Sequence, residues 1–214
     1  MIKNNIRRES YLKFLNTWKN RDLIKVLSGV RRSGKSTLLA MFQQDLKEQG
    51  VQDENIIAIN FEYMEFEELT DYRKLHDYVL SKVDKNKKNY VFLDEIQHVQ
   101  NFEKVVDSLY IRDYIDLYIT GSNAFFLSGE LATLLTGRYI EQHVLPLSFQ
   151  EFKQWHTENN PTIQQLSNRD LYAMYTRSSF PYTLAMTNQQ ETYDYLQAVY
   201  ASVMFRGGSG NLNN

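Results

Sequence analysis

Short runs of hydrophobic residues recur along the chain, and longer stretches with helical spacing of apolar positions separate them. The short runs are rich in β-branched and aromatic residues, which predicts strands. These predicted strands are 23–28, 56–61, 90–95, 116–120 and 139–145. The run 56–61 is apolar almost throughout, which is typical of a strand in a parallel sheet covered on both faces.

The stretches around these runs predict helices. Residues 8–20 predict an amphipathic helix beside the first strand, because their large apolar residues follow helical spacing: Tyr11, Leu12, Phe14, Leu15 and Trp18. The other predicted helices are 35–49, 69–83, 102–113, 130–135, 148–155, 166–176 and 188–205. Gly50 stands where a helix end favours glycine, and Ser148 with Glu151 predicts a capping box.

Chain-breaking segments divide the sequence into three predicted parts. The break at Asn159-Asn160-Pro161 separates a core domain, 1–158, from a small helical region, 159–206. The Gly/Ser/Asn-rich residues 207–214 predict a flexible tail, either a linker or the mark of a truncation. Two charged clusters predict solvated loops: Glu62, Glu65, Glu67 and Glu68, and Lys82, Lys85, Lys87 and Lys88.

Composition narrows the classes of protein that the chain can represent. It has 214 residues, a net charge of −2 and a pI of about 6.1, so no basic field indicates nucleic acid or an acidic membrane surface. There is no cysteine, and hence no disulfide. The N-terminus is charged, and no apolar run approaches the roughly 18 residues that span a bilayer. We therefore expect a soluble cytoplasmic protein without a membrane partner.

Between the first strand and the next helix lies GVRRSGKS, residues 29–36, which fits the phosphate-loop pattern G-x-x-x-x-G-K-[ST]. Its two glycines let the backbone turn tightly and approach a phosphate chain. Amide groups of the loop and of the helix N-terminus direct positive dipole ends at an anion. The order of strand, glycine loop and helix favours a true site over a chance turn. The predicted nucleotide-binding residues are Gly29, Arg31, Arg32, Ser33, Gly34, Lys35, Ser36 and Thr37.

A second chemical element is the pair Asp94 and Glu95 at the end of an apolar strand. Downstream of a phosphate loop, Asp94 can hold Mg²⁺ beside the Ser36 hydroxyl. Glu95 is then placed to orient or deprotonate an attacking water. Without the loop, the same two carboxylates would predict only a solvated strand end.

The next predicted strand ends in Gly121, Ser122 and Asn123. In a parallel sheet, neighbouring strands present their carboxyl ends to the same ligand, so Ser122 or Asn123 could contact the γ-phosphate or the water. Ordinary turn chemistry is the alternative, because Ser and Asn commonly follow Gly in turns.

Several segments together resemble the AAA+-like P-loop ATPases of bacteria and archaea. The similar segments are 24–39, 91–97, 119–123, 127–139 and 145–152, and the resemblance extends over most of residues 8–205. It implies an α/β fold, namely a P-loop NTPase αβα sandwich with a mostly parallel sheet and a small helical lid. It also implies ATP and Mg²⁺ as ligands.

The resemblance further implies roles for individual residues. Lys35 would bind phosphate and assist catalysis, Ser36 and Asp94 would hold Mg²⁺, and Glu95 would be the catalytic base. Ser122 or Asn123 would be the polar sensor. Arg138 lies where AAA+ proteins often keep an arginine finger for a neighbouring subunit, which implies a homo-oligomer. A surface arginine paired with an acid is the alternative.

Two departures from the family pattern concern the C-terminal part of the chain. Family members usually carry Gly-Gly before the Phe-Pro of the lid, where this chain has Ser178 and Ser179. They also usually continue for about another domain, which often resembles winged-helix and nuclease domains. We expect this chain to lack that region, and with it the part that would select a protein or DNA partner.

The favoured function is Mg²⁺-dependent ATP hydrolysis, slow in the isolated chain. ATP is preferred over GTP because no Asn-Lys-x-Asp motif follows the last predicted strand of the core. The alternative is a binding module in which ATP orders the lid and switches a partner surface, with little or no hydrolysis. A small-molecule kinase would require an acceptor pocket, for which the sequence has no motif.

Overall fold

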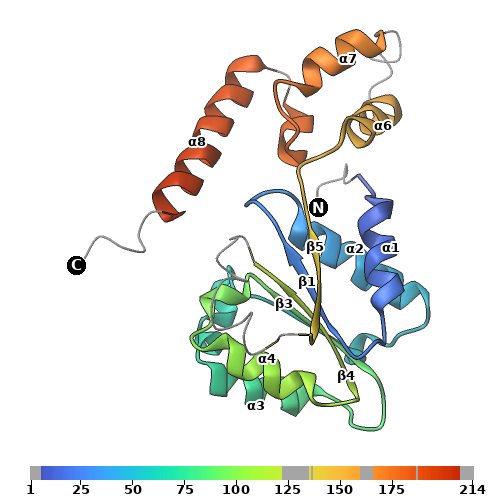
Figure 1. Cartoon of the computed structure of the whole chain (residues 1–214), viewed down its shortest axis with the longest axis vertical. Helices are drawn as coiled ribbons and strands as arrows, with labels where there is room; N and C mark the ends of the chain where they lie inside the picture. The colour runs from blue at the N-terminus through green and yellow to red at the C-terminus, as the bar shows by residue number, and fades with distance from the viewer. Residues whose placement is uncertain (1–5, 122–134, 136, 160–165, 187, 208–214) are drawn as a thin grey trace. The chain divides into compact units, whose positions relative to one another are not determined.

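The computed structural model describes residues 6–121, 135, 137–159, 166–186 and 188–207, coloured along the chain in Figure 1. The chain divides into two compact units. The sheet unit comprises Arg8–Gly29 and Lys35–Val144, and the helical unit comprises Met1–Arg7, Val30–Gly34 and Leu145–Asn214.

The sheet unit contains a five-stranded sheet in which every pairing is parallel. Its strands are β1 (Ile24–Ser28), β2 (Ile56–Asn60), β3 (Asn89–Asp94), β4 (Ile115–Thr120) and β5 (Tyr139–His143). Their order is β2-β3-β4-β1-β5. The predicted α/β fold of a P-loop NTPase is therefore confirmed. Because all strands are parallel, their carboxyl ends meet at one edge of the sheet, where such folds bind ligands.

Helices cover both faces of this sheet (Figure 1). They are α1 (Glu9–Trp18), α2 (Lys35–Glu48), α3 (Tyr72–Lys82) and α4 (Phe102–Tyr110). The apolar sides of α1 and α2 pack on one face around the rings of Phe42, Phe92 and Tyr118, with the last two stacked at 4.8 Å. The apolar sides of α3 and α4 pack on the other face, against the alternate residues of the strands. This burial on both faces explains the apolar runs in the sequence.

The structure differs from the predicted elements at β2 and in the two elements that follow it. The run 56–61 was expected to be covered on both faces, but β2 is an edge strand, and Ala58 is exposed between buried Ile57 and Ile59. The acidic segment after β2 is exposed as expected, but it forms the 3₁₀-helix η2 (Met64–Thr70). The following helix begins only at Tyr72, because the Asp71 side chain caps it.

A buried ion pair joins β1 to β4 near their amino ends. Lys25 Nζ donates to Asp116 Oδ1, and both side chains are almost completely buried. The Tyr118 hydroxyl and the Asn20 amide also donate to this carboxylate, at 2.7 and 2.9 Å. Burial lowers the pKa of Lys25, and the Asp116 charge opposes that shift. The pair lies at the amino edge of the sheet, so its role is structural rather than part of the predicted site.

The helical unit contains α6 (Phe149–Asn159), α7 (Asn168–Tyr175), the 3₁₀-helix η6 (Pro181–Ala185) and α8 (Gln189–Gly207). The predicted capping box is confirmed, because the Ser148 amide donates to Glu151 Oε2 at 2.7 Å and the Glu151 amide donates to Ser148 Oγ at 3.2 Å. The buried core of this unit is formed by Ile6, Leu147, Phe152, Trp155 and Leu184.

The predicted parts 1–158, 159–206 and 207–214 stay predictions. The break at 160–161, the helix expected at 130–135 and residues 208–214 lie outside the described residues. Among the residues that are described, none belongs to a helix long and apolar enough to cross a bilayer.

Candidate functional site

The phosphate loop begins at Gly29, directly after β1. Its φ is +139°, and a Cβ at this position would lie 2.3 Å from the carbonyl oxygen of Val144. Val144 is held there because its amide donates to the Ser28 carbonyl at 2.8 Å. Gly34, at the other end of the loop, has a φ of +100°. Both motif glycines are therefore required by the backbone, which L-residues with a Cβ would strain.

Lys35 is the first residue of α2 and is buried. Its Nζ donates to the Gly29 carbonyl at 3.2 Å and lies 3.6 Å from Oε1 of Glu95. Burial lowers the pKa of Lys35, and the charges of Glu95 and Asp94 oppose that shift. A desolvated ammonium held at the loop is a strong partner for a phosphate oxygen.

Asp94 ends β3 and receives hydrogen bonds from three neighbouring segments. Asn60 Nδ2 at the end of β2 donates to Oδ2 at 2.8 Å, and the Thr120 hydroxyl at the end of β4 donates to Oδ1. The Ser36 side chain on α2 also bonds to this carboxylate. Burial raises the pKa of Asp94, and the hydrogen bonds from Thr120 and Ser36 oppose the rise. The carboxylate is thus fixed in direction beside the Ser36 hydroxyl.

Glu95 follows β3 in a left-handed backbone conformation, with φ 57° and ψ 46°. Its amide donates to the Thr120 hydroxyl oxygen at 2.9 Å, which fixes the backbone at this turn. Its Oε2 accepts from Gln97 Nε2 at 2.5 Å, while Oε1 faces Lys35. A non-glycine residue in this conformation is uncommon, and such residues concentrate at functional sites.

The structure therefore brings Lys35, Ser36, Asp94 and Glu95 together at the carboxyl edge of the sheet. Ser36 and Asp94 supply the oxygen donors that Mg²⁺ prefers. Within the described residues, no group of three or more His, Cys, Asp or Glu could hold a metal by itself. The donor set thus fits a Mg²⁺ that takes its remaining ligands from water and phosphate oxygens. Thr37 is half-buried on α2, and Ser122 and Asn123 lie outside the described residues.

Arg138 is not part of this group. It precedes β5, and its carbonyl accepts from the Ile24 amide at 2.8 Å, so it lies at the amino edge of the sheet. Its guanidinium pairs with Asp107 Oδ1 at 2.5 Å and lies 5.8 Å from the Tyr110 ring centre. This pairing corresponds to the alternative considered for Arg138. An arginine finger acts on the site of a neighbouring subunit, so it also lies away from the site of its own chain. The finger role of Arg138 therefore stays a prediction.

The apex of the phosphate loop, Val30–Gly34, belongs to the helical unit. Arg32 has a φ of +66°, and its guanidinium lies over the rings of Tyr182 and Tyr195. Ser33 is fully buried, whereas Arg31 is half-buried. The predicted phosphate-binding residues thus divide between the sheet unit, with Gly29 and Lys35 to Thr37, and the helical unit, with Arg31 to Gly34.

Sequence reasoning did not select Thr120 or Asn60 as site residues. Both are polar residues at the ends of strands that flank β3 in the sheet, and Asn60 is the direct neighbour of Asp94 in the parallel register. Their polarity at otherwise apolar strand ends was a signal in the sequence. The order of the strands, which decides that they flank Asp94, was not.

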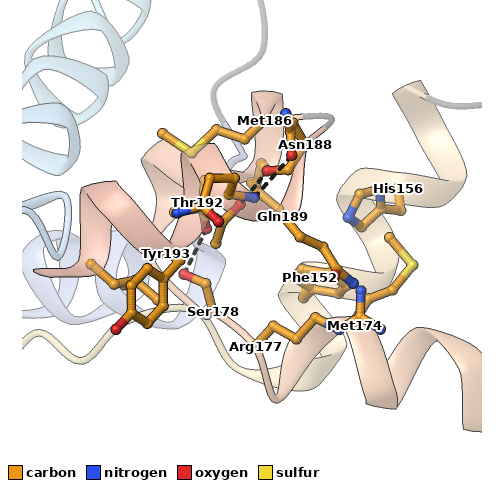
Figure 2. Close-up of a pocket in the computed structure, with 14 residues that line it drawn as sticks. Phe152, His156, Met174, Arg177, Ser178, Met186, Asn188, Gln189, Thr192 and Tyr193 are labelled. Atoms are coloured by element: carbon orange, nitrogen blue, oxygen red, sulfur yellow. Dashed lines mark hydrogen bonds between the residues drawn. The ribbon is translucent and has the colours of Figure 1, made fainter.

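The helical unit also contains a pocket of about 500 Å³ that sequence reasoning did not find. Figure 2 shows Phe152, His156 and Met174 on one side of it and Thr192 and Tyr193 of α8 on the other, and Arg177, Thr183 and Leu184 also line it. His156 is buried and its Nδ1 has no hydrogen-bond partner among the described residues. Burial lowers the pKa of His156, which favours the neutral imidazole.

The sequence model of a family described as "AAA domain" matches residues 21–153. The chain belongs to this AAA domain family. Among solved structures, the domain is similar to the Walker-type ATPase of Pyrococcus abyssi, with a TM-score of 0.60 and 15% identity, over 96% of this chain and 75% of the other. It is also similar to CDC6P of Pyrobaculum aerophilum, with a TM-score of 0.58 and 13% identity, over 97% and 65%. At these identities the likeness shows the fold alone.

Two curated relatives of the AAA domain are uncharacterized proteins. One, from Haemophilus influenzae, is 40% identical over 206 residues, which cover 95% of this chain and 50% of the relative. The other, from Methanocaldococcus jannaschii, is 38% identical over 141 residues, which cover 64% and 29%. The chain thus spans at most half the length of these relatives. The resemblance to AAA+-like P-loop ATPases is confirmed at the level of family and fold.

Proposed function

We propose that this AAA domain binds ATP and hydrolyses it with the help of Mg²⁺. The observation that carries the proposal is the convergence of Ser36 and Asp94, joined by a hydrogen bond, with Lys35 and Glu95, which lie 3.6 Å apart. These side chains supply a phosphate-binding cation, two oxygen donors for a metal and a carboxylate base. Phosphoryl transfer to water requires these components and accurate positioning.

Each residue has a distinct task in this proposal. Lys35 and the loop amides hold the β- and γ-phosphates, while Ser36 and Asp94 would hold the metal, which neutralises charge on the phosphate oxygens when bound. Glu95 accepts the proton of the attacking water through its carboxylate. A phosphate that attracts the Lys35 ammonium would release Glu95 Oε1 from its present partner. Substrate binding would then prepare the base.

The test is ATP binding and phosphate release by the 214-residue chain with Mg²⁺. We expect Lys35→Ala to abolish measurable ATP binding, and Glu95→Gln to retain binding but lose turnover. Lys47→Ala is the matched control, because Lys47 lies on the same helix in an exposed pair with Asp53. Unchanged ATP affinity in Lys35→Ala would refute the proposal.

One observation favours a second function, a nucleotide-gated binding module. Both carboxylate oxygens of Glu95 are engaged in this structure, one by Lys35 and one by Gln97. If nucleotide does not release them, ATP acts as a ligand that orders the lid without being consumed. This second function predicts that wild type and Glu95→Gln bind ATP with equal affinity and that neither protein releases phosphate.

We also propose partners for the chain. If Arg138 acts as a finger in the site of a neighbouring copy, the protein forms a homo-oligomer. The chain covers half the length of one relative, so a protein or DNA partner is likewise a proposal. Among proteins of similar fold, ORC1 of Aeropyrum pernix has been solved in complex with DNA, at a TM-score of 0.51 and 11% identity. We propose a cytoplasmic location, where ATP is available.

A further inference from the structure

Arg32 occupies a turn of the phosphate loop that is unfavourable for its residue type. The Ser33 amide donates to the Val30 carbonyl at 3.2 Å, which closes the turn, and Arg32 has a φ of +66° within it. Turn positions with positive φ favour glycine or asparagine, because a Cβ is crowded there. Contacts outside the turn must therefore stabilise the conformation of the loop.

Two tyrosines supply these contacts. The Arg32 guanidinium lies 6.0 Å from the ring centre of Tyr182 and 5.6 Å from that of Tyr195. The two rings lie 5.0 Å apart and are inclined by 32°, so they form one aromatic surface. Arginine is attracted to the faces of such rings both by its charge and by its planarity.

The contact is embedded in the helical unit. Tyr182 belongs to η6 and Tyr195 to α8, so two elements hold one loop residue. A Cβ at Gly34 would lie 3.7 Å from Pro181 Cγ, so η6 also lies near the end of the loop apex. Val30–Gly34 accordingly forms a compact unit with Leu145–Asn214.

We propose that Tyr182 and Tyr195 are positioning residues for the phosphate loop, which hold Arg32 and thereby preorganise the loop apex for a polyphosphate. The inference rests on the proposed nucleotide binding and adds to it a means by which the C-terminal helices control phosphate affinity. A loop already in its binding conformation loses less freedom on binding, so removal of the two rings weakens binding of the phosphates themselves.

The experiment compares Mg-ATP with tripolyphosphate, which carries the phosphates without a base. The variant is Tyr182→Leu/Tyr195→Leu, and Tyr182→Phe/Tyr195→Phe is the matched control that retains both rings. Each lost ring contact is expected to weaken binding about two- to fivefold, so Kd should rise about four- to twenty-five-fold for both ligands. The Phe control should bind like wild type. Because Tyr182 is exposed, Tyr182→Leu alone replaces the double variant if the latter does not fold.

Three outcomes would overturn the inference. A loss for Mg-ATP but not for tripolyphosphate would make the tyrosines a surface for stacking the base. Tighter binding of both ligands would make the contact an inhibitory one. Unchanged Kd values, with binding still lost in Lys35→Ala, would remove any role in phosphate affinity.

A measurement without nucleotide separates this inference from the proposed function. Hydrogen exchange of the amides in residues 30–36 should be faster in the Leu variant than in wild type, and unchanged in the Phe control. If the wild type binds neither ligand, the proposed function fails, and the exchange rates still decide whether the tyrosines hold the loop. Equal exchange rates in all three proteins would show that they do not.

Discussion

The Thr120 hydroxyl donates a hydrogen bond to Oδ1 of Asp94. The Thr120 hydroxyl oxygen also accepts the amide hydrogen of Glu95 at 2.9 Å, so one fully buried side chain on β4 fixes two successive residues at the end of β3. Asn60, on the other side of β3, completes the support of Asp94. Residues that form hydrogen bonds to a functional side chain restrict its orientation. Catalysis and metal binding both depend on that orientation.

Thr120→Val should impair both stability and function. The valine keeps the shape of threonine but leaves Oδ1 of Asp94 and the buried Glu95 amide without this partner. We expect a loss of about 1–3 kcal/mol in the free energy of unfolding, together with weaker Mg²⁺ dependence of ATP binding. Urea unfolding and ATP titrations at several Mg²⁺ concentrations measure the two effects. Thr120→Ser is the control, since it retains the hydroxyl; equal losses in both variants would contradict this account.

The raised pKa of Asp94 predicts how stability varies with pH in the nucleotide-free protein. Between the ordinary value of 3.8 and the raised value, the native state binds more protons at this carboxyl than the unfolded state does. The free energy of unfolding therefore falls as pH rises through this window, and the penalty of the ionised carboxylate is fully present above it. Asp94→Asn removes the titrating group.

Denaturant unfolding of wild type and Asp94→Asn across this pH range tests the sign. The difference in unfolding free energy, variant minus wild type, should increase as pH rises through the window and then level off. If the introduced asparagine forms poorer hydrogen bonds, the resulting loss in unfolding free energy does not change with pH. The slope of the difference against pH therefore still reports the titration of Asp94. A difference that decreases with pH would mean that the pKa of Asp94 is lowered instead.

Gly29→Ala and Gly50→Ala form a matched pair. Both glycines have positive φ, but a Cβ at Gly29 would lie 2.3 Å from the Val144 carbonyl oxygen, whereas none of the described atoms lies within 4 Å of one at Gly50. Gly50→Ala should lose only about 1 kcal/mol from backbone strain. Gly29→Ala should lose clearly more, because rigid backbone must move. Equal changes in the midpoint of thermal unfolding would show that β1 and the segment after β5 separate easily.

Arg138→Ala distinguishes a finger from a surface ion pair. The pair with Asp107 is nearly half-exposed, so either Arg138→Ala or Asp107→Ala should change the unfolding free energy by at most about 1 kcal/mol. Only Arg138→Ala should reduce phosphate release, and the reduction should reach about 10³-fold if the arginine acts in a neighbouring copy. Turnover of the wild type should then rise with protein concentration. Equal activity of the two variants would assign Arg138 to the ion pair.

Local patterns in the sequence located most of the elements. The five strands, the helix 35–49 and the start of the helix at 148 form close to the predicted residues, because short apolar runs, glycine spacing and capping residues act over a few positions, whereas α6 continues past 155 to Asn159. The start of α3 was predicted less accurately. The helix predicted from Leu69 begins at Tyr72 because of the Asp71 cap.

The sequence by itself located the residues of the candidate site, since Lys35, Ser36, Asp94 and Glu95 belong to motifs of defined spacing. Only the tertiary structure decided that Thr120 and Asn60 support Asp94 and that Arg138 lies at the opposite edge. These relationships follow from strand order, which local propensity does not encode. The contact of Arg32 with Tyr182 and Tyr195 joins distant segments in the same way. Contacts of this kind form only when the packed units bury their apolar surfaces, so they depend on the whole fold rather than on any one segment.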